Sequence, residues 1–249
     1  MTPSFWDHLD ELRGVLIRCA IAWVVCAAAM FCLRDYLFAF LFAPSQPDFI
    51  IYRLLRSLSL GEHFAEVSFI NTELAAQFTT HLEVAALAGL VVAFPYLLWQ
   101  VYGFVEPALY PNEKRAAARI VGAGSVLFLI GLALNYLIIF PFAFRFLSTY
   151  QVQPQVINQI ALTSYTSTLL VLSLVMGMLF EMPMVVWALA KAGLLHADDL
   201  RKYRKHALVA LMILAAVITP TGDAVTLLLV TAPLYLLYEL SIAVIRRMD

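Results

Sequence analysis

Long apolar runs separated by short polar segments dominate the chain and set its overall plan. Six such runs are recognisable, each bounded by charged or turn-forming residues. Only α-helices or closed barrels can cross a lipid bilayer, and no alternating strand pattern competes with the helical one. The runs therefore predict six transmembrane helices, over residues of about 14–33, 78–99, 116–144, 165–190, 205–218 and 224–245.

The fifth run is shorter than the others. Its 12 apolar residues, Ala207 to Ile218, cover roughly 18 Å, whereas the hydrocarbon core of a bilayer is about 30 Å thick. Pro220 and Gly222 follow and prevent a continuous helix. Two interpretations stay open. Either the fifth and sixth helices form a hairpin that stops below the far surface, or flanking residues such as Tyr203 extend the span by snorkelling.

Composition agrees with a membrane protein. Of the 249 residues, 63% are apolar and only 13% are charged, far from the balance of a soluble domain. Most of the chain is span or short loop, so we expect an all-α membrane protein in which residues 1–249 form a single domain. The loop after the first span, residues 34 to about 72, is long and apolar, which predicts a packed cap with short helices.

The basic residues predict the orientation of the spans. With both termini on the cytoplasmic side, twelve Lys and Arg residues fall inside and four fall outside, as the positive-inside rule requires. The inside residues are Arg13, Arg18, Lys114, Arg115, Arg119, Lys191, Arg201, Lys202, Arg204, Lys205, Arg246 and Arg247, and the outside residues are Arg34, Arg53, Arg56 and Arg145.

The segment before the first span is an acidic helix. Its residues divide into an apolar stripe of Phe5, Leu9, Leu12 and Leu16 and three carboxylates outside that stripe, Asp7, Asp10 and Glu11. A helix that lies on lipid normally carries Lys and Arg on its polar face. The carboxylates instead favour a basic partner that is not lipid.

A second carboxylate is expected on the same side of the membrane. Glu113 follows Asn112, a suitable helix cap, and would occupy the first turn of the third span. Taken alone, Glu113 is explained as a residue that stabilises that helix end. Together with Glu11 it forms a hypothetical guanidinium-binding surface, because carboxylates accept Arg in a bidentate fork.

Glu181 is the acidic residue deep inside a span, about twelve residues into the fourth apolar run. Such a group costs several kcal/mol unless it is neutralised or faces water or a partner, so it is a functional candidate. The alternative is a protonated glutamate satisfied by a neighbouring helix. No nucleotide, catalytic or metal-binding motif is present, and the His and Cys residues lack ligand spacing. We therefore expect no enzyme activity, metal, cofactor or nucleic-acid partner.

The sequence resembles the TatC family, the multi-span receptor subunit of the twin-arginine protein translocase. Residues 8–13, His-Leu-Asp-Glu-Leu-Arg, are similar to the signature that opens the family. The similarity continues in order through nearly the whole chain, in blocks at 94–95, 104–110 with Glu113, 140–141, 180–183, 199–204, 219–220 with Asp223, and Pro233 with Glu239. Leu227 departs from the family, which often has Gln there.

The resemblance implies a curved, concave bundle with short fifth and sixth helices, in the bacterial cytoplasmic membrane. It implies twin-arginine signal peptides of folded cargo, TatA- and TatB-like single-span proteins and membrane lipid as partners, with homo-oligomers in the receptor complex and transport driven by the proton-motive force. The residues that it assigns are Glu11, Arg13, Phe104, Leu109, Glu113, Lys114 and Arg115 at the signal-peptide site, Glu181 in the membrane, and Pro44 and Asp223 in outer-side loops.

Features of the spans also allow a different function. Glu181 and the prolines within the spans could serve a proton-coupled secondary transporter of a small solute. Such transporters usually contain paired halves with matching interruptions, and the six runs show no such repeat.

Overall fold

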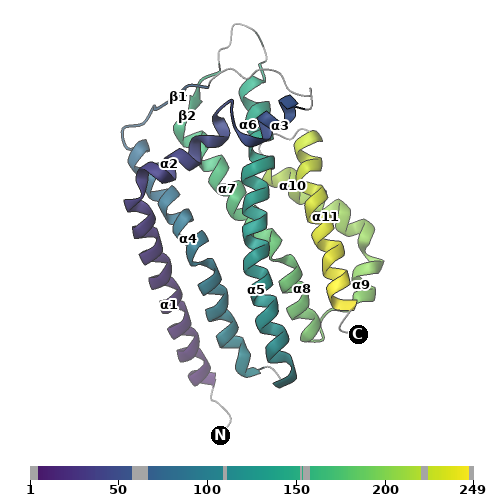
Figure 1. Ribbon diagram of the computed structural model, residues 1–249. Coiled ribbons are helices and arrows are strands. Elements are labelled where there is room, and N and C mark those ends of the chain that lie inside the picture. The colour runs from purple at the N-terminus through teal and green to yellow at the C-terminus, as the bar shows by residue number, and fades with distance from the viewer. Residues whose placement is uncertain are drawn as a thin grey trace.

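The computed structural model describes residues 5–57, 67–108, 111–151, 153, 158–219 and 224–246. Within these ranges the chain is almost entirely helical (Figure 1). The exception is a parallel pair of two-residue strands, β1 (Phe69–Ile70) and β2 (Ile160–Ala161), with Phe69 opposite Ile160. The prediction of an all-α membrane protein is confirmed by this architecture.

Five helical segments of the described chain are long and apolar enough to cross a membrane. They comprise α1 (Phe5–Cys32), α4 (Ala76–Val105), α5 (Pro111–Leu134) continued by a π-helix (Asn135–Ile139) and α6 (Phe140–Thr149), α7 (Leu162–Phe180) continued by α8 (Met182–Lys191), and α11 (Ala224–Arg246). The fifth predicted span is α10 (Arg204–Ile218), whose 15 residues reach about 22 Å. It follows α9 (Ala197–Lys202).

The membrane helices pack in a row in which each contacts the next: α1 on α4, α4 on α5, α5 on α7, α8 on α11, and α11 on α10 (Figure 1). Small residues allow the close approaches, as is common where helices meet in lipid. A Cβ at Gly89 of α4 would collide with the backbone of Ala27 in α1. One at Gly177 of α7 would lie 2.6 Å from the Phe128 ring of α5.

Two of the spans are interrupted, each next to a proline. The π-helix ends just before Pro141, and the α7–α8 break at Glu181 precedes Pro183. Proline lacks an N–H and clashes with the preceding turn, so the regular hydrogen-bond ladder cannot continue through it unchanged. In contrast, Pro95 and Pro233 lie within helices that continue on either side.

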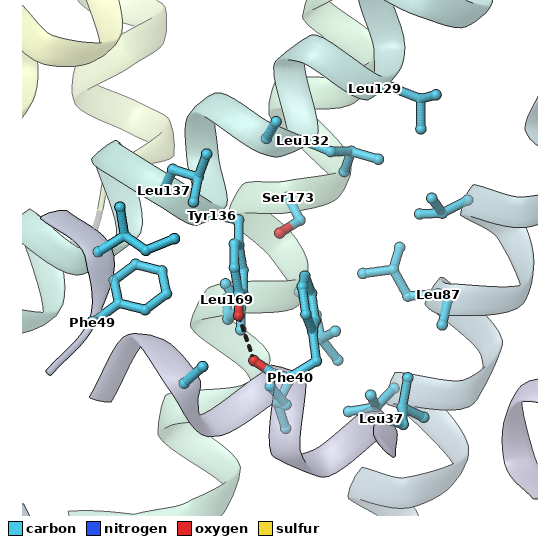
Figure 2. A pocket seen from close by; sticks show the side chains of 18 of the residues that line it. Leu37, Phe40, Phe49, Leu87, Leu129, Leu132, Tyr136, Leu137, Leu169 and Ser173 are labelled. Atoms are coloured by element: carbon cyan, nitrogen blue, oxygen red, sulfur yellow. Dashed lines mark hydrogen bonds between the residues drawn. The ribbon is translucent and has the colours of Figure 1, made fainter. Parts of the chain in front are cut away.

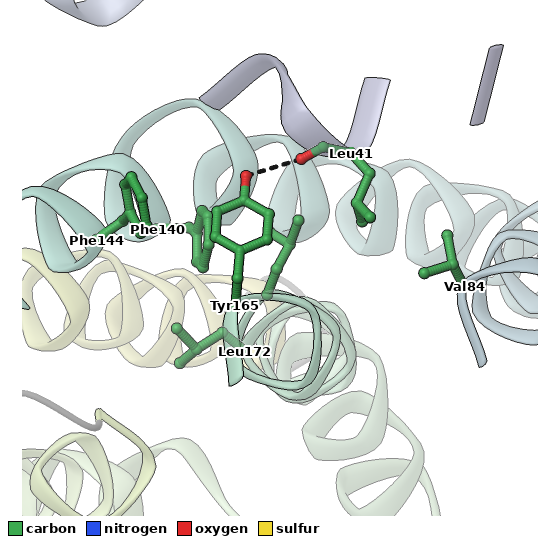
Figure 3. Close-up of a cluster of buried hydrophobic side chains, with 7 residues drawn as sticks. Leu41, Val84, Phe140, Phe144, Tyr165 and Leu172 are labelled. Atoms are coloured by element: carbon green, nitrogen blue, oxygen red, sulfur yellow. Dashed lines mark hydrogen bonds between the residues drawn. The ribbon is translucent and has the colours of Figure 1, made fainter. Parts of the chain in front are cut away.

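The predicted cap contains α2 (Arg34–Phe42), a 3-10 turn (Ala43–Ser45) and α3 (Ile50–Ser57). It lies at the end of the bundle opposite the amino terminus (Figure 1). A buried apolar cluster fastens it to the spans, with Leu41 of α2 against Phe140, Phe144 and Tyr165 (Figure 3). The Tyr165 hydroxyl donates a hydrogen bond to the carbonyl of Leu41, 2.8 Å away.

Tyr52 of α3 provides a second attachment of the cap. Tyr52 is 3% exposed, and its hydroxyl lies 3.2 Å from the Pro44 carbonyl and 3.0 Å from the Pro141 carbonyl. Burial raises the pKa of the Tyr52 phenol well above its usual value, because the charged phenolate is disfavoured away from water. The cap is thereby joined to the π-helix end of the third span.

We expect Tyr52→Phe to lower the stability of the purified protein by about 1 kcal/mol, because the carbonyls of Pro44 and Pro141 lose a buried donor. Thermal unfolding in detergent micelles measures the change. Tyr36→Phe is the matched control, since Tyr36 of α2 is 79% exposed. Equal unfolding temperatures for the two variants would show that the hydroxyl of Tyr52 contributes nothing.

Candidate functional site

The first acidic segment and the turn between the second and third spans lie at the same end of the molecule (Figure 1). This follows from the antiparallel packing of α1 on α4. The Trp23 indole donates to the Ala86 carbonyl at 2.9 Å, and the His81 ring stacks on Phe31 with 3.9 Å between centroids. Extending this register at equal rise per residue brings Glu11 level with residues of about 98–101, in the last two turns of α4.

Glu11 and Arg13 both have exposed side chains on α1, and Phe104 is half-buried on α4. The structure therefore places these three predicted residues toward the same end of the α1–α4 pair. Arg115, in the first turns of α5, is also exposed at this end. Glu113 belongs to α5, but its side chain and the whole of Leu109 lie outside the described part of the structure.

The α4–α5 turn is held by contacts that link its two sides. The Lys114 ammonium lies 3.2 Å from the Glu106 carboxylate, and each side chain is 40% exposed. The Tyr102 hydroxyl donates to the Lys114 carbonyl at 2.9 Å. Tyr102 itself is buried with Ala117 of α5 and Trp187 of α8. The orientation of the first turn of α5 is thus fixed by packing as well as by charge.

Glu106 is the residue that sequence reasoning missed here. It lies in the motif block at 104–110, but only its neighbours were selected as site residues. A signal was available, since a carboxylate eight positions before Lys114, across a turn containing Pro107, can reach that ammonium. By pairing with Lys114, Glu106 offsets the charge of the cation that follows Glu113 in the sequence.

Glu181 occupies the break between α7 and α8 and is 8% exposed. Within the described residues neither carboxylate oxygen has a hydrogen-bond partner. The side chain reaches α5 at Gly124, where an added Cβ would come within 2.7 Å of Oε2 and 2.9 Å of Met184 Sδ. An unpaired buried carboxyl in a membrane helix is costly, so the protonated form or a polar partner is required there.

The remaining predicted residues lie elsewhere. Pro44 is buried in the cap, at the opposite end of the bundle from Glu11, where its carbonyl faces Tyr52. Asp223 lies outside the described residues. No group of three or more His, Cys, Asp or Glu side chains with metal-binding geometry occurs among the residues that the structure describes.

The fold and these features define the class of the protein: an all-helical integral membrane protein with exposed charged residues of both signs at its amino-terminal end. Residues 7–233 match the family model described as Sec-independent protein translocase protein (TatC). The chain belongs to the TatC family.

Individual relatives agree with this assignment. The chain is 32% identical over 248 residues to a Sec-independent protein translocase protein TatC of Blattabacterium, covering 96% of this chain and 93% of the relative. It is 32% identical to the TatC protein of Escherichia coli K12, covering 97% and 87%. A crystal structure described as the twin arginine translocase receptor TatC in DDM superposes with a TM-score of 0.75 at 32% identity, covering 96% of this chain and 99% of that one.

The resemblance noted from the sequence is therefore confirmed. The family is a component of a protein translocase, and these similarities favour that function over a secondary transporter of small solutes.

We expect Gly124→Val to destabilise the protein by about 1–3 kcal/mol, because its branched side chain would overlap the Glu181 carboxylate. Gly122→Val is the matched control, since a Cβ at Gly122 meets nothing within 4 Å. Thermal unfolding in micelles compares the two.

A double-mutant cycle assigns the effect to Glu181. In a Glu181→Ala background the penalty of Gly124→Val should fall, because the space occupied by the carboxylate becomes available. An undiminished penalty would contradict the contact between these two positions.

Proposed function

We propose that the chain is the twin-arginine signal-peptide receptor and core subunit of a translocase that moves folded proteins across the cytoplasmic membrane, driven by the proton-motive force. Its similarity along nearly the whole chain to the twin arginine translocase receptor supports this function. The proposal assigns no catalytic step to the chain. Its partners are twin-arginine signal peptides, TatA- and TatB-like single-span proteins, further copies of the chain, and lipid.

The observation that carries the proposal is the antiparallel packing of α1 on α4. It places the acidic segment around Glu11 beside the end of α4, next to the turn that begins α5. Glu113 follows directly in that first turn of α5. Two carboxylates at one surface suit two adjacent guanidinium groups, because each can accept one Arg in a bidentate pair.

The neighbouring residues complete the proposed surface. Phe104 and Leu109 supply apolar contact for the peptide segment beside the arginines, while Arg13 and Arg115 flank the carboxylates. Lys114 is engaged by Glu106 at 3.2 Å, which lowers its competition for Glu113. The site is then acidic where the paired arginines bind, although cations lie close by.

The distribution of basic residues supports an orientation with both termini in the cytoplasm and all six helices, α10 included, embedded in the membrane. Eleven of the described Lys and Arg residues lie on the helix segments directed toward the amino-terminal end of the bundle: Arg13, Arg18, Lys114, Arg115, Arg119, Lys191, Arg201, Lys202, Arg204, Lys205 and Arg246. Four lie toward the cap: Arg34, Arg53, Arg56 and Arg145. In this arrangement residues 1–249 form one membrane domain.

An ion pair joins α10 to α11 at the proposed cytoplasmic end. The Arg204 guanidinium lies 2.6 Å from the Glu239 carboxylate, and the Tyr235 hydroxyl donates to the same carboxylate at 3.1 Å. The Tyr238 hydroxyl donates to the Leu200 carbonyl of α9 at 2.6 Å. We propose that the helix pair α10–α11 is embedded as a hairpin of short helices, with the bilayer thinned beside it.

We expect the double variant Glu11→Gln and Glu113→Gln to bind a twin-arginine signal peptide about tenfold or more weakly, because two charge-assisted contacts are lost. Binding of a fluorescent peptide to purified protein in nanodiscs measures this. Asp10→Asn is the matched control, since Asp10 is an exposed carboxylate next to Glu11 on the same helix.

A twin-lysine peptide sharpens the test. Lysine cannot form the bidentate fork. The twin-lysine peptide should therefore bind the wild-type protein weakly and lose little further affinity in the double variant. Unchanged arginine-peptide affinity in the double variant would overturn the assignment of Glu11 and Glu113.

A further inference from the structure

A groove of about 850 Å³ lies between the cap and the spans, at the end of the bundle away from Glu11 (Figure 2). Apolar side chains of α2, α4, α5 with its π-helix, and α7 form most of its wall, among them Phe40, Leu87, Leu132 and Leu169. The signal-peptide surface described above does not include this groove.

The groove is open to the side. Several lining residues keep large exposed fractions, including Ile50 at 67%, Phe40 at 60%, Val92 at 54% and Leu129 at 45%. In a membrane these side chains would face the hydrocarbon of the bilayer, so lipid has direct lateral access.

The groove is one leaflet deep. Its wall on α4 runs from Val84 to Val92, and its wall on the third span runs from Leu129 to Leu137. Eight residues of helix rise about 12 Å, close to half of a hydrocarbon core of about 30 Å. Below the deepest lining residues, Phe94 of α4 stacks on Phe128 of α5 with 3.5 Å between ring centroids. This ring pair closes the space between the two helices on the side of the groove away from the cap.

The polar groups inside the groove are already engaged. The Tyr136 hydroxyl donates to the Phe40 carbonyl at 2.6 Å (Figure 2). Ser173 accepts a hydrogen bond from the Asn135 amide at 2.9 Å. The interior therefore offers an apolar surface to its occupant.

Polar groups gather at one end, where the segment from the 3-10 turn to α3 forms the rim. Gln46, Asp48 and Arg53 line the groove there. Asp48 pairs with Arg56 at 2.9 Å, and this hydrogen bond, with the charges of Arg56 and Arg53, lowers the pKa of the Asp48 carboxyl. Because Arg56 offsets Asp48, the exposed Arg53 guanidinium leaves the rim with one net positive charge.

We propose that this groove binds an anionic phospholipid, with an acyl chain along the apolar wall and the phosphate at Arg53. A cationic rim above an apolar slot of one-leaflet depth matches a molecule with a phosphate at one end and hydrocarbon at the other. A transmembrane helix fits less well, since it is 10–12 Å wide and needs about 20 residues to span. The leaflet is the outer one if the proposed orientation holds, but binding itself does not depend on that orientation.

Native mass spectrometry of the purified protein, titrated with phosphatidylglycerol or phosphatidylethanolamine, tests the proposal. We expect one retained phosphatidylglycerol that is lost in Ala133→Trp, because Ala133 lines the groove and an indole would fill it. Ala28→Trp is the control, since Ala28 is exposed on α1 and does not line the groove.

The headgroup contact is tested separately. Arg53→Gln should weaken phosphatidylglycerol binding about fivefold and affect phosphatidylethanolamine less, whereas Arg34→Gln, at the same end but outside the groove, should leave both unchanged.

Lipid retention that is equal in Ala133→Trp and wild type would overturn the proposal. The proposal would also be overturned if Ala133→Trp abolished crosslinking to a single-span protein while lipid binding persisted. The groove would then be a binding site for protein. Signal-peptide binding, measured in the same variants, reports on the proposed receptor function independently of lipid.

Discussion

Close packing at small residues is the constraint on which the rest of this structure depends. Between helices in lipid there is little hydrophobic driving force, so van der Waals contact has to supply cohesion. Gly89 lets α4 meet the backbone of α1, and Gly131 lies against the Met176 carbonyl and the Phe180 ring of α7. The α1–α4 contact in turn decides which surface residues become neighbours, since it brings the segment around Glu11 to the end of α4.

Departures from regular helix occur where polar groups sit inside the bundle. Asn135 is fully buried at the start of the π-helix and donates to Ser173, while Glu181 sits at the α7–α8 break. Both positions have a buried oxygen without a partner among the described residues. Such irregular backbone is tolerated at membrane depth only where neighbouring protein or water can satisfy the freed groups. The buried polar groups and the interruptions of the helices therefore occur at the same positions, Asn135 and Glu181.

The two ends of the bundle differ in character, and this difference suits a receptor. The amino-terminal end presents exposed charges on short connections, with Glu106 and Lys114 joined across one turn. The opposite end is covered by a cap that tyrosine hydroxyls attach to the spans. Tyr52 of the cap donates to the Pro141 carbonyl. Tyr136 and Tyr165 of the spans donate to the Phe40 and Leu41 carbonyls of the cap. The exposed charged end is thus separated from the packed region that fixes the helices relative to one another.

The apolar runs by themselves determined the helical membrane class and the approximate spans, because satisfying the backbone in lipid leaves few alternatives. The ordered motif blocks indicated the family, and the short fifth run predicted the 15-residue α10. The pairing of Glu106 with Lys114, the π-helix at Asn135 and the contact of Glu181 with Gly124 became visible only in the tertiary structure. Each depends on which helix faces which, and hydropathy carries no information on that, since most faces of a membrane helix are apolar whether they meet lipid or protein.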